Sequence, residues 1–434
     1  MAKRSLKVIS CVFLMTVACS SSVWAAGFAL YEWSASGNAQ VNAVVARGDS
    51  PSTVANNPAG MVNLEGTQVM AGATFIYPRG KVGITTNNQS FEPIENRPEA
   101  GLPPYFYATQ KLGDRFALGM GIYSRFGLST KYANNWPGRY SEYYASISSV
   151  SFTPSVAVKI MDGLSFGAGI EIMYLQFEQR ALARTLFPLV AASEDIPARL
   201  KASSMGFGGN ASVLYEPVDW LSMGFIWRSQ IKHVLKGSAK YDKVGKPAAN
   251  AAGIYEDSDA HGNLMLPQSF TGGIALKPIE NFVVEFDATW TGWSSYKEFK
   301  VIYNKQPYDS SVDATDVAVK DWKDVWQFNI GLEYGLTDWL DARLGYAYDF
   351  SPQRDEQLAY SLPTGDRQWF AGGLGFHNDN WCLDASYTYL ISAARDGNIL
   401  VSDATVAGSP QTTYQSEFKD AYAHLIGLSL GYKF

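Results

Sequence analysis

The stretch YAHLIGLSLGYKF, residues 422–434, ends the chain and alternates strictly along its length. Tyr422, Ile426 and Phe434 belong to a face of mostly large side chains, whereas Gly427, Ser429 and their neighbours on the other face are mostly small or polar. A period of two residues indicates a β-strand. This run is longer than the usual soluble strand of about 5–6 residues.

The same alternation recurs upstream, at 326–334 and at 282–290. In the first of these, Trp326, Phe328 and Ile330 alternate with polar or small residues, and in the second a similar apolar face opposes acidic residues. One face of each stretch is therefore apolar and the other is mostly polar, as expected for strands between lipid and an aqueous lumen.

Short and long connections also alternate. Six tight turns are predicted at 113–114, 162–163, 217–219, 278–281, 336–338 and 378–380. Seven long polar stretches lie between them, at 83–103, 129–145, 183–203, 237–265, 297–322, 351–365 and 396–415. These connections imply 14 strands, and an even number with short turns at one end is typical of bacterial outer-membrane barrels. Trp220, Trp339 and Trp381 follow short turns, where an interfacial aromatic girdle is expected.

The expected fold class is thus all-β, a 14-stranded antiparallel transmembrane β-barrel. Because unpaired amides in hydrocarbon cost several kcal/mol, such a sheet must close. A water-soluble sandwich would not require outward apolar rows on nearly every strand. With 434 residues, 35 Lys+Arg against 41 Asp+Glu and 18% charged residues, the chain is too apolar for disorder and too acidic for a nucleic-acid binder.

The first 25 residues read as a secretory signal peptide. Lys3, Arg4 and Lys7 precede an apolar run at 8–18, and Ala25 offers a cleavage site. The run is too short for a membrane anchor, and the residues before Cys19 lack the leucine of a lipoprotein signal. Cleavage would leave Cys382 alone, so no intramolecular disulfide is expected.

Residues 26–65 lack sustained alternation. We expect them to form an N-terminal hatch inside the lumen, with the barrel spanning 66–434, because a 14-stranded barrel is wide enough to hold a plug. A disordered periplasmic arm is the alternative. The turn signal of Asn57-Pro58-Ala59 and the small residues around it favour packing.

Several short motifs along the mature chain resemble those of the FadL/TodX family of outer-membrane transporters for long-chain fatty acids and other hydrophobic compounds. They are Ala26-Gly27-Phe28, Asn57-Pro58-Ala59, Trp293-Ser294, Lys323-Asp324, Ser351-Pro352 and Tyr432-Lys433-Phe434. The resemblance implies gated passive diffusion, in which substrate passes from an outer groove to a pocket near the mature N-terminus. It then leaves sideways through the barrel wall at a kinked third strand.

The resemblance also suggests site residues. Phe28 matches the pocket phenylalanine, and Phe126 and Gly127 lie in the region that matches the kink. Arg180 and Lys320 are the nearest equivalents of two basic residues that hold a carboxylate, although neither aligns cleanly. The gating role is further assigned to the Asn57-Pro58-Ala59 tripeptide, which we expect to pack against the kink.

An apolar island in an extracellular loop is the remaining candidate for substrate binding, because exposed apolar patches usually bind something. It contains Leu186, Phe187, Leu189 and Val190. A loop that only packs on its neighbours is the alternative. If neither basic residue faces the pocket, a neutral, aromatic hydrocarbon becomes the better substrate.

Two other function classes remain open. A general porin would leave an open polar lumen, and a barrel phospholipase would need a Ser-His pair, which we do not find. The pattern at 163–167 resembles a nucleophile elbow but follows a turn into a strand. We expect no enzyme activity, cofactor or metal, since the four histidines lack ligand spacing.

The expected location is the outer membrane of a Gram-negative cell. The partners would be its lipid and lipopolysaccharide, a hydrophobic small molecule, and the barrel-assembly machinery, which would read the terminal Phe434. We expect no nucleic-acid partner and a monomeric state.

Overall fold

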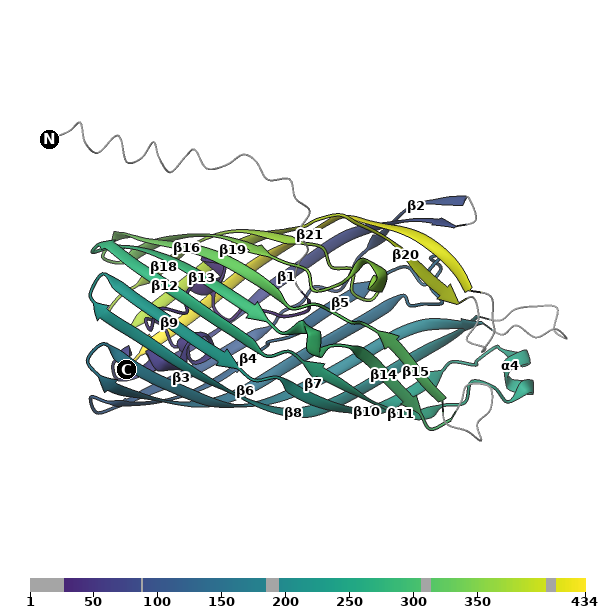
Figure 1. Cartoon of the computed structure of the whole chain (residues 1–434), viewed down its shortest axis with the longest axis horizontal. Coiled ribbons are helices and arrows are strands. Elements are labelled where there is room, and N and C mark those ends of the chain that lie inside the picture. The colour runs from purple at the N-terminus through teal and green to yellow at the C-terminus, as the bar shows by residue number, and fades with distance from the viewer. Residues whose placement is uncertain (1–26, 87–88, 185–194, 306–313, 403–410) are drawn as a thin grey trace, which may run out of the picture.

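The computed structural model describes residues 27–86, 89–184, 195–305, 314–402 and 411–434. Nearly all of them belong to one antiparallel sheet that closes on itself as a barrel of 14 strands (Figure 1). The first strand pairs with the last, from Gln68 opposite Lys433 to Thr85 opposite Gln415. This closure confirms the predicted fold.

Several barrel strands are broken into two segments by short irregular stretches. The segments are β1 (Thr67–Thr86), β2 (Gln89–Asn96), β3 (Pro104–Leu112), β4 (Phe116–Tyr123), β5 (Gly127–Lys131), β6 (Tyr144–Met161), β7 (Leu164–Arg184), β8 (Asp195–Val218), β9 (Leu221–Arg228), β10 (Ile231–Tyr241), β11 (Ser258–Leu266), β12 (Ser269–Ile279), β13 (Phe282–Thr291), β14 (Glu298–Tyr303), β15 (Ala314–Val319), β16 (Val325–Thr337), β17 (Leu340–Asp349), β18 (Arg367–His377), β19 (Trp381–Ser392), β20 (Arg395–Ser402) and β21 (Gln411–Lys433).

The predicted tight turns each join two strands in the structure. The predicted long loops, however, are too long. β7 continues to Arg184, and β10 pairs with β11 as far as Ala239 opposite Ser258, inside the expected loop at 237–265. Beyond the hydrocarbon both faces of a strand meet polar surroundings, so the apolar alternation fades although the hydrogen-bonded ladder continues.

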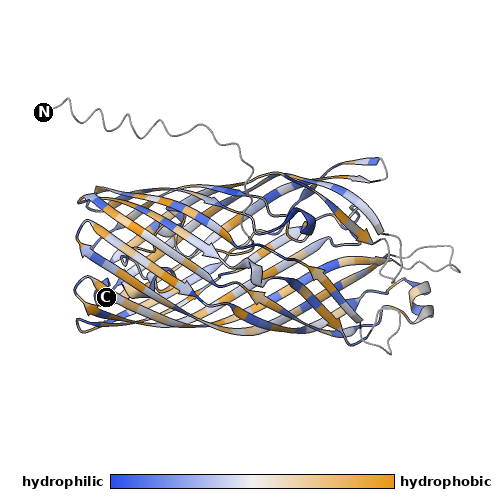
Figure 2. Cartoon of the chain, in the orientation of Figure 1, coloured by the Kyte–Doolittle hydropathy of each residue, from blue (hydrophilic) through white to orange (hydrophobic). Residues whose placement is uncertain are grey.

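Hydrophobic and hydrophilic residues alternate along the strands (Figure 2), and large apolar side chains are exposed on the outer surface, as the alternation predicted. Phe207, Leu344 and Leu428 are among its exposed side chains, and the girdle tryptophans Trp220 and Trp339 are more than half exposed. Among the described residues, no helix is both long and apolar enough to cross a membrane.

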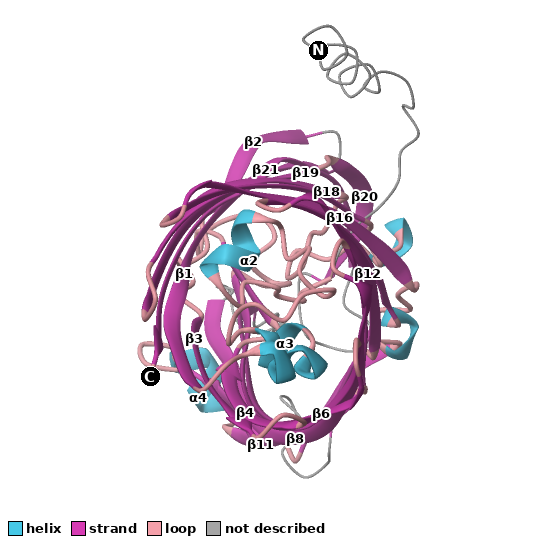
Figure 3. Cartoon of the chain, turned by 90° about the vertical axis from the view of Figure 1, so that its left-hand side faces the viewer, coloured by secondary structure: helices cyan, strands magenta, loops and turns pink. Residues whose placement is uncertain are grey.

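The segment 27–66 lies inside the barrel, where the helices α2 (Ala35–Ala39) and α3 (Thr53–Asn56) appear in the view along the barrel axis (Figure 3). A 3-10 turn, η1 (Pro58–Asn63), follows. We call residues 27–66 the lumen segment. The predicted signal peptide, residues 1–25, lies outside the described residues. The other short helices, α4 (Pro247–Ala252), η2 (Trp293–Ser295) and η3 (Asp355–Gln357), lie between strand segments.

Buried charges anchor the lumen segment to the wall near the short-turn end. The Arg47 guanidinium lies 2.8 Å from a Glu285 carboxylate oxygen, and its other ion pairs reach Asp49 and Glu333. The Asp287 carboxylate accepts hydrogen bonds from backbone N–H groups of the same segment, at 3.1 and 3.2 Å. Acidic residues that face the lumen therefore hold the lumen segment in place.

Candidate transport pathway

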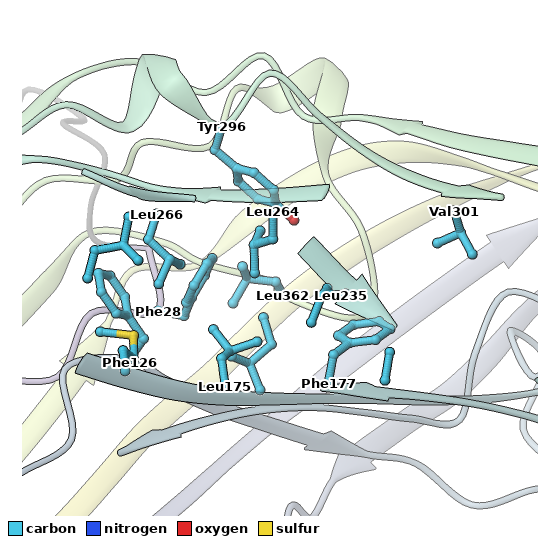
Figure 4. Packing of buried hydrophobic residues seen from close by; sticks show 14 of the residues in the cluster. Phe28, Phe126, Leu175, Phe177, Leu235, Leu264, Leu266, Tyr296, Val301 and Leu362 are labelled. Atoms are coloured by element: carbon cyan, nitrogen blue, oxygen red, sulfur yellow. The ribbon is translucent and has the colours of Figure 1, made fainter. Parts of the chain in front are cut away.

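The extracellular half of the lumen is lined by apolar side chains (Figure 4). The charged groups around Arg47 and Glu285 lie below it. We call the region with the apolar lining the apolar chamber. Its main members are Phe28, Phe126, Ile147, Met173, Leu175, Phe177, Leu200, Ile231, Leu235, Leu264, Leu266, Trp293, Tyr296, Val301, Trp322, Val325 and Leu362. They come from the strands on one side of the barrel, β6 to β16, and from the lumen segment and the connections between strand segments, and they point toward one another.

Phe28 lies at the centre of this chamber and is 2% exposed. Its ring centroid is 4.9 Å from that of Trp293 and 5.8 Å from that of Phe126. The preceding residue must be small, because a Cβ on Gly27 would come within 2.7 Å of both Trp293 and Trp322. The structure thus places the pocket phenylalanine among aromatic rings at the start of the lumen segment.

The third barrel strand breaks between β4 and β5, at residues 124–126. The backbone of the lumen segment pairs with this break: Leu30 N–H donates to the Arg125 carbonyl at 2.7 Å, and Gly127 N–H donates to the Phe28 carbonyl at 3.0 Å. The Ser149 hydroxyl accepts from Phe126 N–H at 3.0 Å. The polar groups of the kink are therefore satisfied by the lumen segment on one side and by Ser149 of β6 on the other.

The break leaves the wall unpaired between the second and third strands. The ladder between β3 and β4 runs only to Phe106 opposite Ile122, and hydrogen bonding resumes at Arg97, whose N–H donates to the Lys131 carbonyl. Within the described residues, the facing stretches 98–104 and 124–130 share no ladder. We call this interruption the lateral gap.

A cavity of about 610 Å³ lies along the lateral gap. Its lining includes both edges of the gap, together with Phe28 and Leu30 of the lumen segment. It also includes residues from both faces of β6: Ile147 on the lumen side and Val150 on the lipid side. The lining of the cavity at the lateral gap thus includes residues of both the lumen face and the lipid face of the wall.

Two cationic side chains on the cavity lining were not predicted. Arg367 donates to the Gly27 carbonyl at 3.3 Å, and Arg395 donates to the Thr364 carbonyl at 2.7 Å. Arg367 is two residues before the buried Trp369 at the start of an alternating strand, a spacing that places it on the lumen face. From this spacing the sequence could have indicated that Arg367 faces the lumen.

Arg180 does not point into the chamber. Met173, Leu175 and Phe177 mark the inward face of β7, so the even-numbered positions, including the exposed Tyr174, face outward. Arg180 lies on that outward face, where it pairs with Glu178 at 2.7 Å. The expectation that it lines the pocket is wrong, because a shift of one residue along a strand moves a side chain to the opposite face.

Lys320 lies between β15 and β16. It is near the buried Glu142 and the exposed Asp316. Burial lowers the pKa of Lys320, and the same burial raises the pKa of Glu142 to about 7. The Gln179 side chain donates to Glu142 at 3.2 Å, and Ser361 also hydrogen-bonds to it. Glu142 was not among the site residues predicted from the sequence.

The Asn57-Pro58-Ala59 tripeptide packs elsewhere than expected. The Asn57 amide donates to the Val45 and Val213 carbonyls at 2.7 and 3.1 Å, and Ala59 N–H donates to the Ser212 hydroxyl at 3.0 Å. The tripeptide therefore contacts β8 and not the kink, so the predicted contact with Phe126 and Gly127 is wrong. The backbone of residues 28–30 occupies the kink instead.

The apolar island predicted in the loop falls on Leu186, Phe187, Leu189 and Val190, which lie outside the described residues. Among the described residues, no group of three or more His, Cys, Asp or Glu side chains has the arrangement of a metal site.

Comparison with known proteins places these features in a family. Residues 16–434 match the model of the outer membrane protein transport protein family (OMPP1/FadL/TodX). The long-chain fatty acid transport protein of Escherichia coli O6:H1 is 25% identical over 464 residues, with 100% of both chains covered.

Solved structures share the fold. A FadL homologue from Pseudomonas aeruginosa superposes with a TM-score of 0.80 at 19% identity, over 94% of this chain and 100% of that one. The toluene transporter TodX of P. putida gives 0.68 at 15% identity, over 93% and 98%. With a family match across almost the whole chain and the same barrel architecture, this protein belongs to the OMPP1/FadL/TodX family of outer membrane transport proteins.

Proposed function

We propose that this protein takes up long-chain fatty acids or similar hydrophobic molecules by passive diffusion, with lateral exit through the barrel wall. The observation that carries the proposal is the cavity that touches both faces of β6 beside the lateral gap. A hydrophobic molecule that leaves by this route enters the membrane without crossing the charged lower lumen.

The apolar chamber supports the first part of the route. Transfer of an apolar chain from water into such surroundings is favourable by about 25 cal/mol per Å² of buried apolar surface. The charged anchors around Arg47 and Glu285 occupy the direct path toward the periplasm, and an acyl chain has no favourable contact there. The driving force therefore favours a sideways path.

The lumen segment would act as the hatch of this route. Residues 28–30 both contribute Phe28 to the chamber and pair with the kink at the lateral gap. A substrate that displaces the Phe28 ring would thus also disturb the backbone contacts that fill the gap. This coupling of the pocket to the exit is the gating mechanism that we propose, with Phe126 and Gly127 on the wall side.

The head group of the substrate is a separate question. Lys320, Arg367 and Arg395 provide positive charge at or near the route and favour a carboxylate. The aromatic lining and the outward position of Arg180 favour the second candidate, a neutral aromatic hydrocarbon such as the toluene named for the structural relative TodX.

Gly127 offers a direct test of the lateral exit. A Cβ at this position would lie 2.7 Å from the Leu30 side chain, inside the cavity. We expect Gly127→Glu to abolish fatty-acid uptake by cells while the barrel still folds. Gly83→Glu is the matched control, because a Cβ there makes only an ordinary contact of 3.4 Å with Glu417. Normal uptake by the folded Gly127 variant would argue for a straight-through channel.

A further inference from the structure

One sector of the outer wall carries a cluster of positive charge. Arg180 of β7 lies opposite Arg199 of β8, which in turn lies opposite Lys240 of β10. Lys201 occupies the next outward position on β8, and Lys236 lies two outward positions from Lys240 on β10, opposite Ser203. We call these five residues the basic face.

The basic face is positive although the chain is not. The outward positions at this level from β6 to β11 include five basic residues and two acidic ones, Glu178 and Asp259, and a third carboxylate, Asp257, lies beside Tyr241 just before β11, which leaves a net charge of +2. The whole chain carries −6. Glu178 contacts both Arg180 and Arg199, at 2.7 and 2.8 Å, so one carboxylate holds two guanidinium groups side by side.

The basic face also stands at a defined depth. Two outward rows closer to the short-turn end, the exposed side chains are apolar. In that row Val150 lies opposite Tyr174, and Tyr174 lies opposite Met205; the three side chains are between 45% and 52% exposed. The charges therefore begin where the lipid-facing band ends, on the side of the long loops, which face the cell exterior in barrels of this kind.

Charge at this boundary varies around the barrel. On β17, β18, β19 and β21 an outward row of Tyr348, Gln368, Ile391 and Tyr422 has no charged side chain, although the row continues to Arg79 of β1. The next outward position on β1 is Lys81, which pairs with Asp420. The basic face therefore differs from the rest of the boundary in having five basic side chains on three adjacent strands.

We propose that the basic face binds the phosphorylated head group of an outer-leaflet lipid, with lipopolysaccharide as the occupant. Its acyl chains would lie on the apolar row of Val150, Tyr174 and Met205, and its phosphates would contact the guanidinium and ammonium groups above. Arginine side chains present donors in a fork that matches phosphate oxygens, and nearby lysines add charge. The basic side chains point away from the lumen, but Val150 and Glu178 also line the cavity at the lateral gap, so the lipid site borders the transport route.

The experiment uses the full-length protein in detergent, titrated with lipopolysaccharide and with enzymatically dephosphorylated lipopolysaccharide. We expect the triple variant Arg199→Ala/Lys201→Ala/Lys236→Ala to bind lipopolysaccharide about 100-fold more weakly, since each charge near an anionic lipid surface contributes about a factor of five to ten. The control Lys111→Ala/Lys159→Ala/Lys277→Ala removes the same charge near the short turns and should bind as the native protein does. Heat-modifiable migration on a gel reports folding of both.

The native protein should also lose most of its affinity for the dephosphorylated lipid, a result that does not depend on any variant. Equal affinity of the native protein for both lipids would overturn the proposal, because acyl contacts alone would then explain binding. Equal affinity of the folded triple variant and the control would overturn it as well. Loss of fatty-acid uptake in the Gly127 variant with unchanged lipopolysaccharide binding would separate the two proposals.

Discussion

The two halves of the lumen differ in the side chains that line them and in the kind of contact that these side chains make. Near the short turns, Arg47, Glu285 and Asp287 fix the lumen segment with buried charges and hydrogen bonds. Toward the exterior, Phe28, Trp293 and their neighbours form an apolar chamber that offers only non-directional contacts. Directional bonds hold one geometry, whereas apolar packing tolerates a moving ligand. The contrast assigns anchoring to the lower half and passage to the upper half.

The largest expected effect comes from breaking the anchor. Arg47→Ala would leave Glu285 and Asp287 buried with less compensation, which costs about 3–5 kcal/mol for a buried ion pair. We expect hydrogen exchange in residues 35–63 to accelerate and steady single-channel conductance to appear. Lys81→Ala, which removes an exposed pair with Asp420, is the control. Unchanged exchange in the Arg47 variant would show that the anchor does not hold the segment.

The stability of residues 132–143, the stretch that contains Glu142, should depend on pH. Burial raises the pKa of Glu142 to about 7 from 4.5, so the folded state favours the protonated acid. The resulting stabilisation, roughly 3 kcal/mol at most, is fully present below pH 4.5 and is lost as the pH rises through 7. Hydrogen exchange at 132–143 should therefore be slower at pH 5 than at pH 8 after correction for intrinsic rates. Glu142→Gln should remove this difference, and its persistence in that variant would exclude Glu142 as the cause.

The charge at the top of the chamber gives a smaller effect. We expect Lys320→Ala to weaken fatty-acid binding by about 1.5–3 kcal/mol, the value of a hydrogen bond to a charged group, and to leave binding of a neutral alkane unchanged. Arg180→Ala, on the outward face, should change neither. Isothermal titration of both ligands would measure this. Equal losses for the two ligands in the Lys320 variant would reject its role with a carboxylate.

The smallest expected effect on the lumen comes from the end of the chain. Phe434 closes an alternating strand with an exposed aromatic side chain. Deletion of Phe434 should lower the yield of folded protein in the outer membrane, because the predicted assembly signal is lost, while the protein that does fold keeps normal uptake. A gel of unheated and heated samples would report the yield, and an unchanged yield would count against that signal.

The sequence predicts the barrel well because one physical constraint acts on every strand. Lipid outside and polar groups inside impose a period of two, and tight turns mark the ends, as at 162–163 and 378–380. The extent of the strands could not be predicted in the same way. Past Gly237, for example, β10 has no lipid to face, so its pairing leaves no apolar pattern.

The site is harder to predict because it depends on contacts between distant residues. Phe28 and the kink at Gly127 could be located through the family motifs. Arg180 could not, since a placement uncertain by one residue reverses the face. Glu142 belongs to no sequence motif. It stands out only in the structure, where it is buried near Lys320 and Ser361.

The most direct test of the separation between anchor and passage is the position of a bound substrate. We propose diffraction from crystals of the native protein soaked with a fatty acid that carries bromine at its terminal carbon. We expect anomalous peaks in the chamber and in the cavity at the lateral gap, near Phe28, Gly127 and Ile147. Peaks along the barrel axis below the lumen segment, beside Arg47 and Arg343, would contradict it.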